Sequence, residues 1–91
     1  MVIWSDTAKQ DLKQIYNYIA RDSKFYALKV VEEIVEGSEK LGLFPKMGRI
    51  VPETDTQNIR ELIIYSYRLI YKVSADMVEI LTIVHVKRDF L

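Results

Sequence analysis

The side chains best suited to chemistry gather near the end of the chain, in the stretch LTIVHVKRDFL from Leu81 to Leu91. This stretch contains the only histidine of the sequence, His85, followed closely by Lys87 and Arg88. An imidazole titrates near neutral pH and can act as a general acid or base, and arginines can bind a phosphate. Such groups together could cleave RNA through attack of its 2′-hydroxyl, with His85 moving the proton.

Arginines elsewhere in the chain could supply the phosphate contacts of such a site. Arg68 is the first candidate, and Arg49 or Arg60 could line the same site. Other interpretations remain open, because a histidine at a strand end is often only a half-exposed polar residue. Arg68 could equally pair with Glu61 or with a carboxylate of a partner. The charged run Lys87–Arg88 could be merely solvated, or it could belong to a binding surface.

Length and composition limit what the protein can be. The 91 residues fit one domain, residues 1–91, and a hydrophobic share of 49% is enough for a compact core. Thirteen basic residues balance thirteen acidic ones, which argues against a generic nucleic-acid coat. Without cysteine, a metal-spaced histidine pair or a glycine-rich phosphate loop, the sequence indicates no cofactor and no metal. We expect a cytoplasmic protein that binds no membrane, since no apolar span or signal peptide is apparent.

The pattern of apolar residues predicts a strand, two helices and three further strands. Val2 to Trp4 is short and β-favouring, and apolar residues at helical spacing follow as far as Ile19. Ser23 is a candidate cap for a second amphipathic helix from about Lys24 to Leu41, in which Gly37 indicates close packing against a neighbour. The predicted strands of an antiparallel meander are Ile59 to Ile64, Tyr67 to Val73 and Met77 to Val86. The predicted fold is α+β, in the order β-α-α-β-β-β, with a helical hairpin packed on a small, mainly antiparallel sheet.

The turn between the last two predicted strands suggests a register. A turn centred on Ala75–Asp76 pairs Val73 with Val78 and places Lys72 opposite Glu79, an arrangement that cross-strand electrostatics favour. Because side chains alternate along a strand, this register assigns every later residue of the last strand to one face of the sheet.

Strict alternation from that register brings Arg68 and His85 to the same face and the same end of the sheet. The same face carries Ile70, Leu81 and Ile83, and the chain has no third helix to cover them. An exposed apolar stripe on a small domain usually marks an interaction surface. We therefore expect this face to bind a partner protein.

Three stretches that span nearly the whole chain resemble a known family. IWSDTAKQDLKQIYNYIARDS, LGLFPKMGRIVPE and IRELIIYSYRLIYKVSADMVEILTIVHVKRDF resemble, in order and spacing, the ParE branch of the ParE/RelE toxins of type II toxin–antitoxin systems. This branch includes growth-inhibiting plasmid stabilisation toxins. The most specific matches are Tyr16 with Tyr18-Ile19-Ala20, Leu43-Phe44-Pro45 with Gly48-Arg49, Arg60-Glu61-Leu62, Tyr67-Arg68 with Tyr71, and His85 with Arg88-Asp89. The resemblance implies the fold predicted above and a toxin that a cognate antitoxin neutralises.

The resemblance also implies one of two targets. ParE-like members act on DNA gyrase, whereas RelE-like members cut messenger RNA on the ribosome. Arg68 matches the arginine that RelE-like nucleases use against the scissile phosphate, and Lys87 and Arg88 fall where those nucleases carry further cations. The neutral charge favours gyrase, as does Phe90 where a nuclease often has a tyrosine or another acid–base group. An inactive homologue that only binds an antitoxin is a third interpretation.

Two sets of site residues follow from these interpretations. A RelE-like nuclease would use three residues for catalysis, namely Arg68, His85 and Arg88. A toxin that acts by binding would contact its antitoxin or target through Arg68, Ile70, Leu81, Ile83, His85, Lys87, Arg88 and Phe90, or through the groove beside the helical hairpin.

Overall fold

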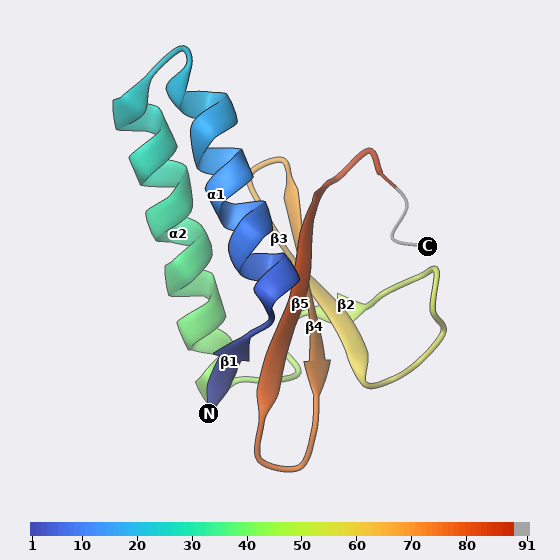
Figure 1. Cartoon of the computed structure of the whole chain (residues 1–91). Helices are drawn as coiled ribbons and strands as arrows, with labels where there is room; N and C mark the ends of the chain where they lie inside the picture. Colours follow the sequence, from blue (N-terminus) through green and yellow to red (C-terminus); the bar gives the residue numbers. More distant parts are fainter. Residues whose placement is uncertain (89–91) are drawn as a thin grey trace.

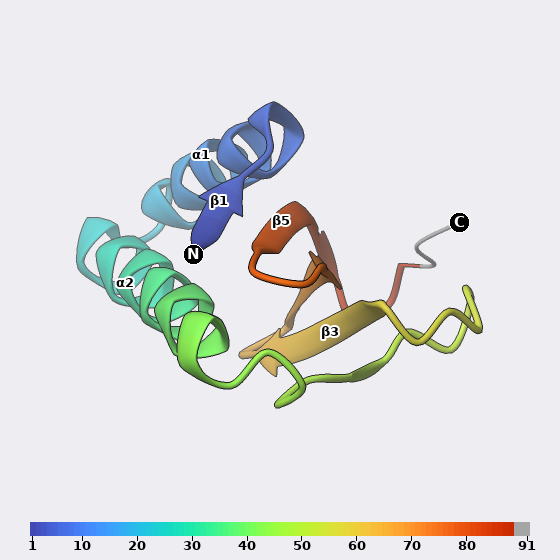
Figure 2. The same ribbon diagram turned by 90° about the horizontal axis from the view of Figure 1, so that it is seen from below.

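The computed structural model describes residues 1–88 and arranges seven elements in the order β-α-α-β-β-β-β (Figure 1). They are β1 (Val2–Trp4), α1 (Asp6–Ala20), α2 (Lys24–Leu43), β2 (Arg49–Ile50), β3 (Ile59–Ile64), β4 (Tyr67–Val73) and β5 (Val78–His85). The strands form one sheet in the order β1-β5-β4-β3-β2, in which β1 runs parallel to β5 and the other neighbours are antiparallel. Both helices cover the same side of this sheet (Figure 2). The predicted fold class is confirmed, and only the two-residue strand β2 is an unpredicted element.

Serine caps determine where both helices begin. The Ser5 side chain accepts a hydrogen bond from the Ala8 amide at 3.0 Å, and Ser23 accepts one from the Tyr26 amide at 3.1 Å. Each cap satisfies an amide that has no partner inside its helix. The predicted cap at Ser23 is confirmed. Neither helix of the described chain combines the length and the apolar content that a membrane crossing requires.

The core lies between the helical hairpin and the sheet. It is formed by buried residues of both layers, namely Ala8, Ile15, Val30, Ile34, Leu41, Leu69, Tyr71, Val78, Ile80 and Ile83. Gly37 lies where α2 comes close to β3, because a Cβ atom at this position would lie 2.6 Å from Ile64 Cδ1 and 3.3 Å from Leu62 Cδ2. The predicted close packing at this glycine is confirmed.

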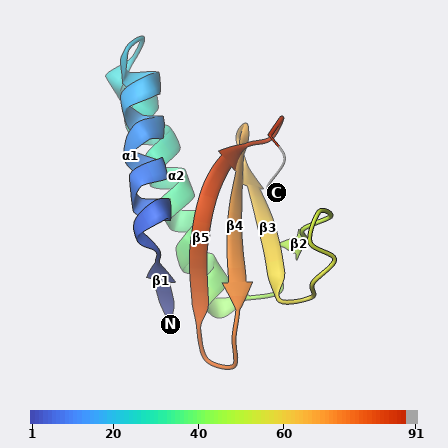
Figure 3. The same ribbon diagram turned by 45° about the vertical axis from the view of Figure 1, so that its right-hand side comes forward.

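β1 and the residues at the start of α1 together cover the outer edge of β5. β1 pairs only with residues 78–80, so the rest of the edge would be open (Figure 3). There the Ser5 hydroxyl donates to the Leu81 carbonyl at 2.8 Å, and the Asp11 carboxylate accepts from the Ile83 amide at 3.0 Å. Side chains at the start of α1 therefore satisfy backbone groups that an open edge would offer to other chains.

A bulge in β5 overturns part of the predicted register. The predicted pairs next to the turn are confirmed, with Val73 opposite Val78 and Lys72 opposite Glu79. Midway along the ladder, however, β5 contains one extra residue, Leu81. One extra residue moves every later side chain of the strand to the opposite face.

The prediction of an exposed apolar stripe is therefore wrong. Ile83 and His85 lie on the helix side of the sheet, where Ile83 is 4% exposed in the core and His85 contacts the ring of Tyr67. Ile70 does face away from the helices, but it is 0% exposed. Leu81, the bulged residue, is half-buried. The chain thus closes this face without a third helix.

Candidate functional site

The helix-free face of the sheet carries a buried ion-pair network centred on Arg68. The Arg68 side chain is only 6% exposed, and its Nε donates to Glu61 Oε1 at 2.7 Å. Its Nη1 and Nη2 donate to the two oxygens of Glu53 at 2.9 and 2.8 Å. Arg49 pairs with the second oxygen of Glu61, whose side chain is fully buried. Two carboxylates thus enclose the guanidinium that the sequence offered as a phosphate ligand.

Arg68 also donates a hydrogen bond to the backbone. Its Nη1 also donates to the Arg88 carbonyl at 2.7 Å, so four of the five N–H donors of a guanidinium are engaged. The hydrogen bond to Glu53 and, against the effect of burial, that to Glu61 raise the pKa of Arg68 above its usual value. The pairing of Arg68 with Glu61, one of the three interpretations of this arginine, is confirmed.

The local sequence explains how this network assembles. Glu61 faces away from the helices in β3, and burial of a carboxylate is costly unless charged partners and hydrogen bonds compensate it. β2 brings Arg49 directly opposite Glu61, and the segment after β2 adds Glu53 and the fully buried Val51. Within residues 1–88, every buried side-chain nitrogen and oxygen has a hydrogen-bond partner. The segment after β2 therefore covers the helix-free face of the sheet and supplies a carboxylate that balances the charge of Arg68.

Arg60 has a structural partner as well. The Arg60 Nη1 donates to the Gly48 carbonyl at 2.9 Å. The Tyr71 hydroxyl contacts the same turn, because it donates to the Pro45 carbonyl at 2.7 Å and accepts from the Gly48 amide at 2.9 Å. A Cβ atom at Gly48 would overlap the backbone carbonyl of Glu61, so the close approach requires glycine. These contacts fix the turn that leads into β2, and with it the position of Arg49.

His85 lies on the other side of the sheet from Arg68. It lines a hollow between α1 and the end of β5 together with Asp11, Tyr18 and Tyr67, and its Nδ1 accepts from the Lys87 amide at 3.2 Å. The predicted juxtaposition of Arg68 and His85 on one face is therefore wrong, because the bulge turns His85 toward the helices. No group of three or more potential metal ligands occurs among residues 1–88. Phe90, the last predicted site residue, lies outside the described residues.

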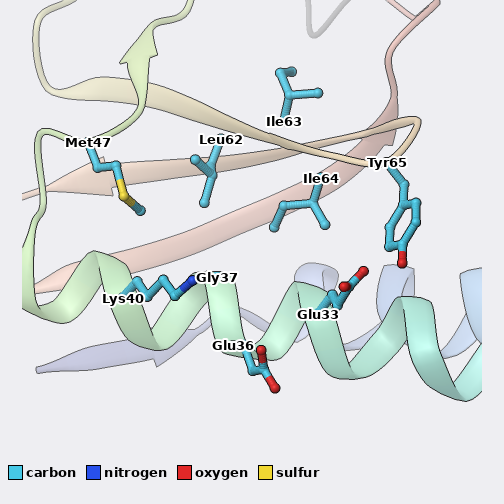
Figure 4. A pocket seen from close by; sticks show the side chains of 9 residues that line it. All are labelled: Glu33, Glu36, Gly37, Lys40, Met47, Leu62, Ile63, Ile64 and Tyr65. Atoms are coloured by element: carbon cyan, nitrogen blue, oxygen red, sulfur yellow. The ribbon is translucent and has the colours of Figure 1, made fainter.

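An open groove runs between α2 and β3 (Figure 4). It has a volume of about 500 Å³ and is lined by Glu33, Glu36, Gly37, Lys40, Met47, Leu62, Ile63, Ile64 and Tyr65. Leu62 and Ile64 point toward α2, with Met47 at one end and Tyr65 at the other. Met47 is 45% exposed and Tyr65 is 42% exposed, so both ends offer apolar surface to a partner.

Tyr65 closes its end of the groove in a strained conformation. Its φ of 54° lies in the left-handed region, which costs a non-glycine residue roughly 1–2 kcal/mol. A hydrogen bond to Glu33 raises the pKa of Tyr65 to about 12, and the ring packs edge-on against Tyr26 at 6.0 Å between centroids. The two-residue link Tyr65–Ser66 between two predicted strands was the available signal for a tight turn.

Comparison with known proteins identifies the family. Residues 2–90 match the family model described as the ParE toxin of the type II toxin–antitoxin system, parDE. The chain belongs to the ParE toxin family. A solved structure described as the chromosomal ParDE TA system from P. aeruginosa is 26% identical to this ParE-type toxin, with a TM-score of 0.75 and 92% of each chain covered. No curated protein matches the chain. The resemblance drawn from the sequence motifs is confirmed.

The network predicts that Glu61 contributes strongly to the stability of this ParE-type toxin. Glu61→Gln should lower the free energy of unfolding by about 3 kcal/mol, because it removes one buried partner of Arg68. Glu79→Gln, at the cross-strand pair with Lys72, is the matched control and should cost less than about 1 kcal/mol. Urea unfolding of both variants measures the difference. Equal losses would show that the buried pair contributes no more than a surface pair.

Proposed function

We propose that this ParE-type toxin poisons DNA gyrase in the cytoplasm by binding to it, and that a cognate antitoxin neutralises the toxin. The observation that carries the proposal is the placement of Arg68, whose guanidinium is held by Glu53 and Glu61. An RNA-cleaving site needs a cation free to meet the phosphate, and an acid–base group on the same side of it. Arg68 is engaged by carboxylates, and the sheet separates it from His85. Arg88 is exposed and lines the hollow of His85, but the other charged side chain described there is the carboxylate of Asp11.

The charge distribution supports the same conclusion. The chain has no net charge, whereas a nuclease that works on ribosome-bound RNA benefits from a cationic surplus. Lys87 and Arg88 are exposed, and the Arg49 side chain is 66% exposed even though its Nε is paired. These cations can meet an acidic surface of a partner protein, where charges mainly determine orientation and the rate of association.

The groove between α2 and β3 is the surface that we propose for the antitoxin. Ile70 and Ile83 are buried and cannot serve as anchors in this fold, and Leu81 is half-buried at the bulge. Of the two predicted binding surfaces, we therefore favour the groove beside the helical hairpin. Its floor is apolar, and its α2 side carries Glu33, Glu36 and Lys40. A helix or extended tail with apolar anchors fits such a groove, since buried apolar contacts dominate affinity at protein interfaces.

We expect expression of the toxin to arrest bacterial growth, and co-expression of the antitoxin encoded beside it to restore growth. The purified toxin should block DNA supercoiling by gyrase or stabilise gyrase-dependent breaks, while messenger RNA on ribosomes stays intact. His85→Ala should reduce gyrase inhibition only slightly, because a binding surface seldom depends on one titratable group. Arg88→Glu should reduce it more, because the new carboxylate would repel an acidic target surface.

A nuclease would give the opposite order of these two variants. Loss of a general acid or base typically lowers a rate by about 10²- to 10⁴-fold, so His85→Ala would then be the severe change. Ribosome-dependent cuts that disappear with His85→Ala, alongside unaffected gyrase, would reject gyrase as the target. Unimpaired growth with soluble, folded toxin would instead favour the inactive homologue.

Residues of the groove between α2 and β3 should determine the affinity of the toxin for its antitoxin. Met47→Glu should weaken binding roughly 30-fold, because it replaces an apolar contact of about 2 kcal/mol with a charge. Tyr65→Asn should also weaken binding, although asparagine tolerates the left-handed conformation and the fold should persist. The matched control is Leu28→Glu, which changes an apolar residue of α2 that is 52% exposed and does not line the groove. Isothermal titration calorimetry compares the three variants, and equal effects at Met47 and Leu28 would exclude the groove.

A further inference from the structure

The Arg68 network joins three segments that are distant in the sequence. Glu61 belongs to β3, Glu53 to the segment that follows β2, and the Arg88 carbonyl to the segment 86–88 that follows β5. The segment after β2 and the segment after β5 both lie away from the helices (Figure 2). One guanidinium therefore connects the sheet, its covering segment and the basic end of the described chain.

The bond from Arg68 gives the Arg88 backbone a contact with a distant part of the fold. The Val86 amide still follows the sheet and donates to the Ser66 carbonyl at 2.8 Å. The Arg88 amide donates to the His85 carbonyl at 2.9 Å, which is a local turn contact. The Arg88 carbonyl accepts from Arg68 Nη1 at 2.7 Å, and this contact ties the turn to β4. The direction in which the segment leaves β5 thus depends on Arg68.

The same network fixes a second exposed cation nearby. Arg49 and Arg88 line one hollow on the helix-free face, together with Pro52, Glu53, Ile63, Arg68 and Val86. Arg49 is held through its Nε by Glu61, and Glu61 is held by Arg68. Arg68 therefore helps to position Arg49 through Glu61, and it holds the backbone of Arg88 directly.

We propose that Arg68 is a positioning residue, which holds the Lys87–Arg88 segment beside Arg49 so that these cations meet an acidic surface of the target protein together. The inference rests on the proposed function, because it concerns the surface that would bind gyrase. Arginine suits this role, because its planar fork grips the Glu53 carboxylate with two nitrogens and still reaches the Arg88 carbonyl. A lysine ammonium is a point charge and cannot span all three segments.

Stability and positioning can be separated by experiment. Replacement of a buried ion pair by apolar residues of similar volume is often neutral for stability, whereas the loss of one partner is not. The double variant Arg68→Met/Glu61→Leu removes both buried charges and should therefore stay folded. It has no donor for the Arg88 carbonyl, so the segment 86–88 loses its contact with the Arg68 side chain of β4 while the Val86 and Arg88 amides keep their own bonds.

The first measurement is backbone amide exchange in the free toxin. In the double variant Arg68→Met/Glu61→Leu we expect the Arg88 amide to exchange about tenfold faster, the effect of losing one charge-assisted hydrogen bond, while the Ile70 amide in β4 stays unchanged. The matched control Lys72→Met/Glu79→Leu makes the corresponding change at another cross-strand pair of a cation and a carboxylate, in which Lys72 is exposed and Glu79 is half-buried. Exchange at Arg88 should not change in the control.

The second measurement is gyrase inhibition at matched concentrations of folded toxin. The double variant should require roughly tenfold more protein for the same inhibition, in parallel with the faster exchange, and the control should match the wild type. Wild-type values for both readouts in the double variant would overturn the proposal. So would faster exchange of Arg88 with full inhibition, or a uniform change at Arg88 and Ile70, which would reveal only a stability role.

A conservative variant keeps the proposal testable if the double variant does not fold. Arg68→Lys keeps the buried charge, and it should give the same selective change at the Arg88 amide and the same loss of inhibition. Retention of both wild-type values in Arg68→Lys would overturn the proposal. Failure of the wild-type toxin to inhibit gyrase would contradict the proposed function instead, and the exchange measurement on the free toxin would still report whether Arg68 positions the segment.

Discussion

The buried carboxylate of Glu61 is the constraint on which the helix-free half of the structure depends. An unpaired charge at this depth costs several kcal/mol, so β3 can carry Glu61 only if cations from neighbouring strands reach both of its oxygens. Arg68 of β4 supplies one contact and Arg49 of β2 the other. Arg68 in turn requires Glu53, which draws the segment after β2 over the sheet. This chain of requirements explains how the face is closed without a third helix.

The burial of Glu61 also bears on the choice between the two functions that the motifs suggested, gyrase poisoning and RNA cleavage. The sequence alone does not show whether an arginine pairs with a carboxylate inside the protein or binds a phosphate outside it. In this ParE-type toxin the carboxylates are internal, and Arg68 contributes to architecture rather than to an open site. Two surfaces that remain available to partners are the groove between α2 and β3 and the exposed cations of Arg49, Lys87 and Arg88. Surfaces of this kind suit binding, and we have assigned the first to the antitoxin and the second to the target.

The sequence predicted what local patterns determine and missed what depends on a single residue or on distant partners. Both helices, the cap at Ser23 and the register next to the β4–β5 turn followed from periodicity, capping and charge pairing. The bulge at Leu81 could not be read from the sequence, because its neighbours favour a strand on either face. β2 is too short to give a periodic signal, and the contact of Glu53 with Arg68 joins residues from an irregular segment and a strand. Those three unpredicted features decide which candidate site residues lie together.

The most direct test of this account is the side-chain NMR signal of Arg68. Its Nε–H lies in a buried bond to Glu61, so it should exchange slowly with solvent and keep its chemical shift when a single-stranded RNA oligonucleotide or inorganic phosphate is added. The Nε–H signal of an arginine on the surface, such as Arg21, provides the fast-exchanging reference in the same spectrum. A rapidly exchanging Arg68 signal that shifts on addition of RNA would contradict the account, because it would show that the guanidinium is free to meet a phosphate.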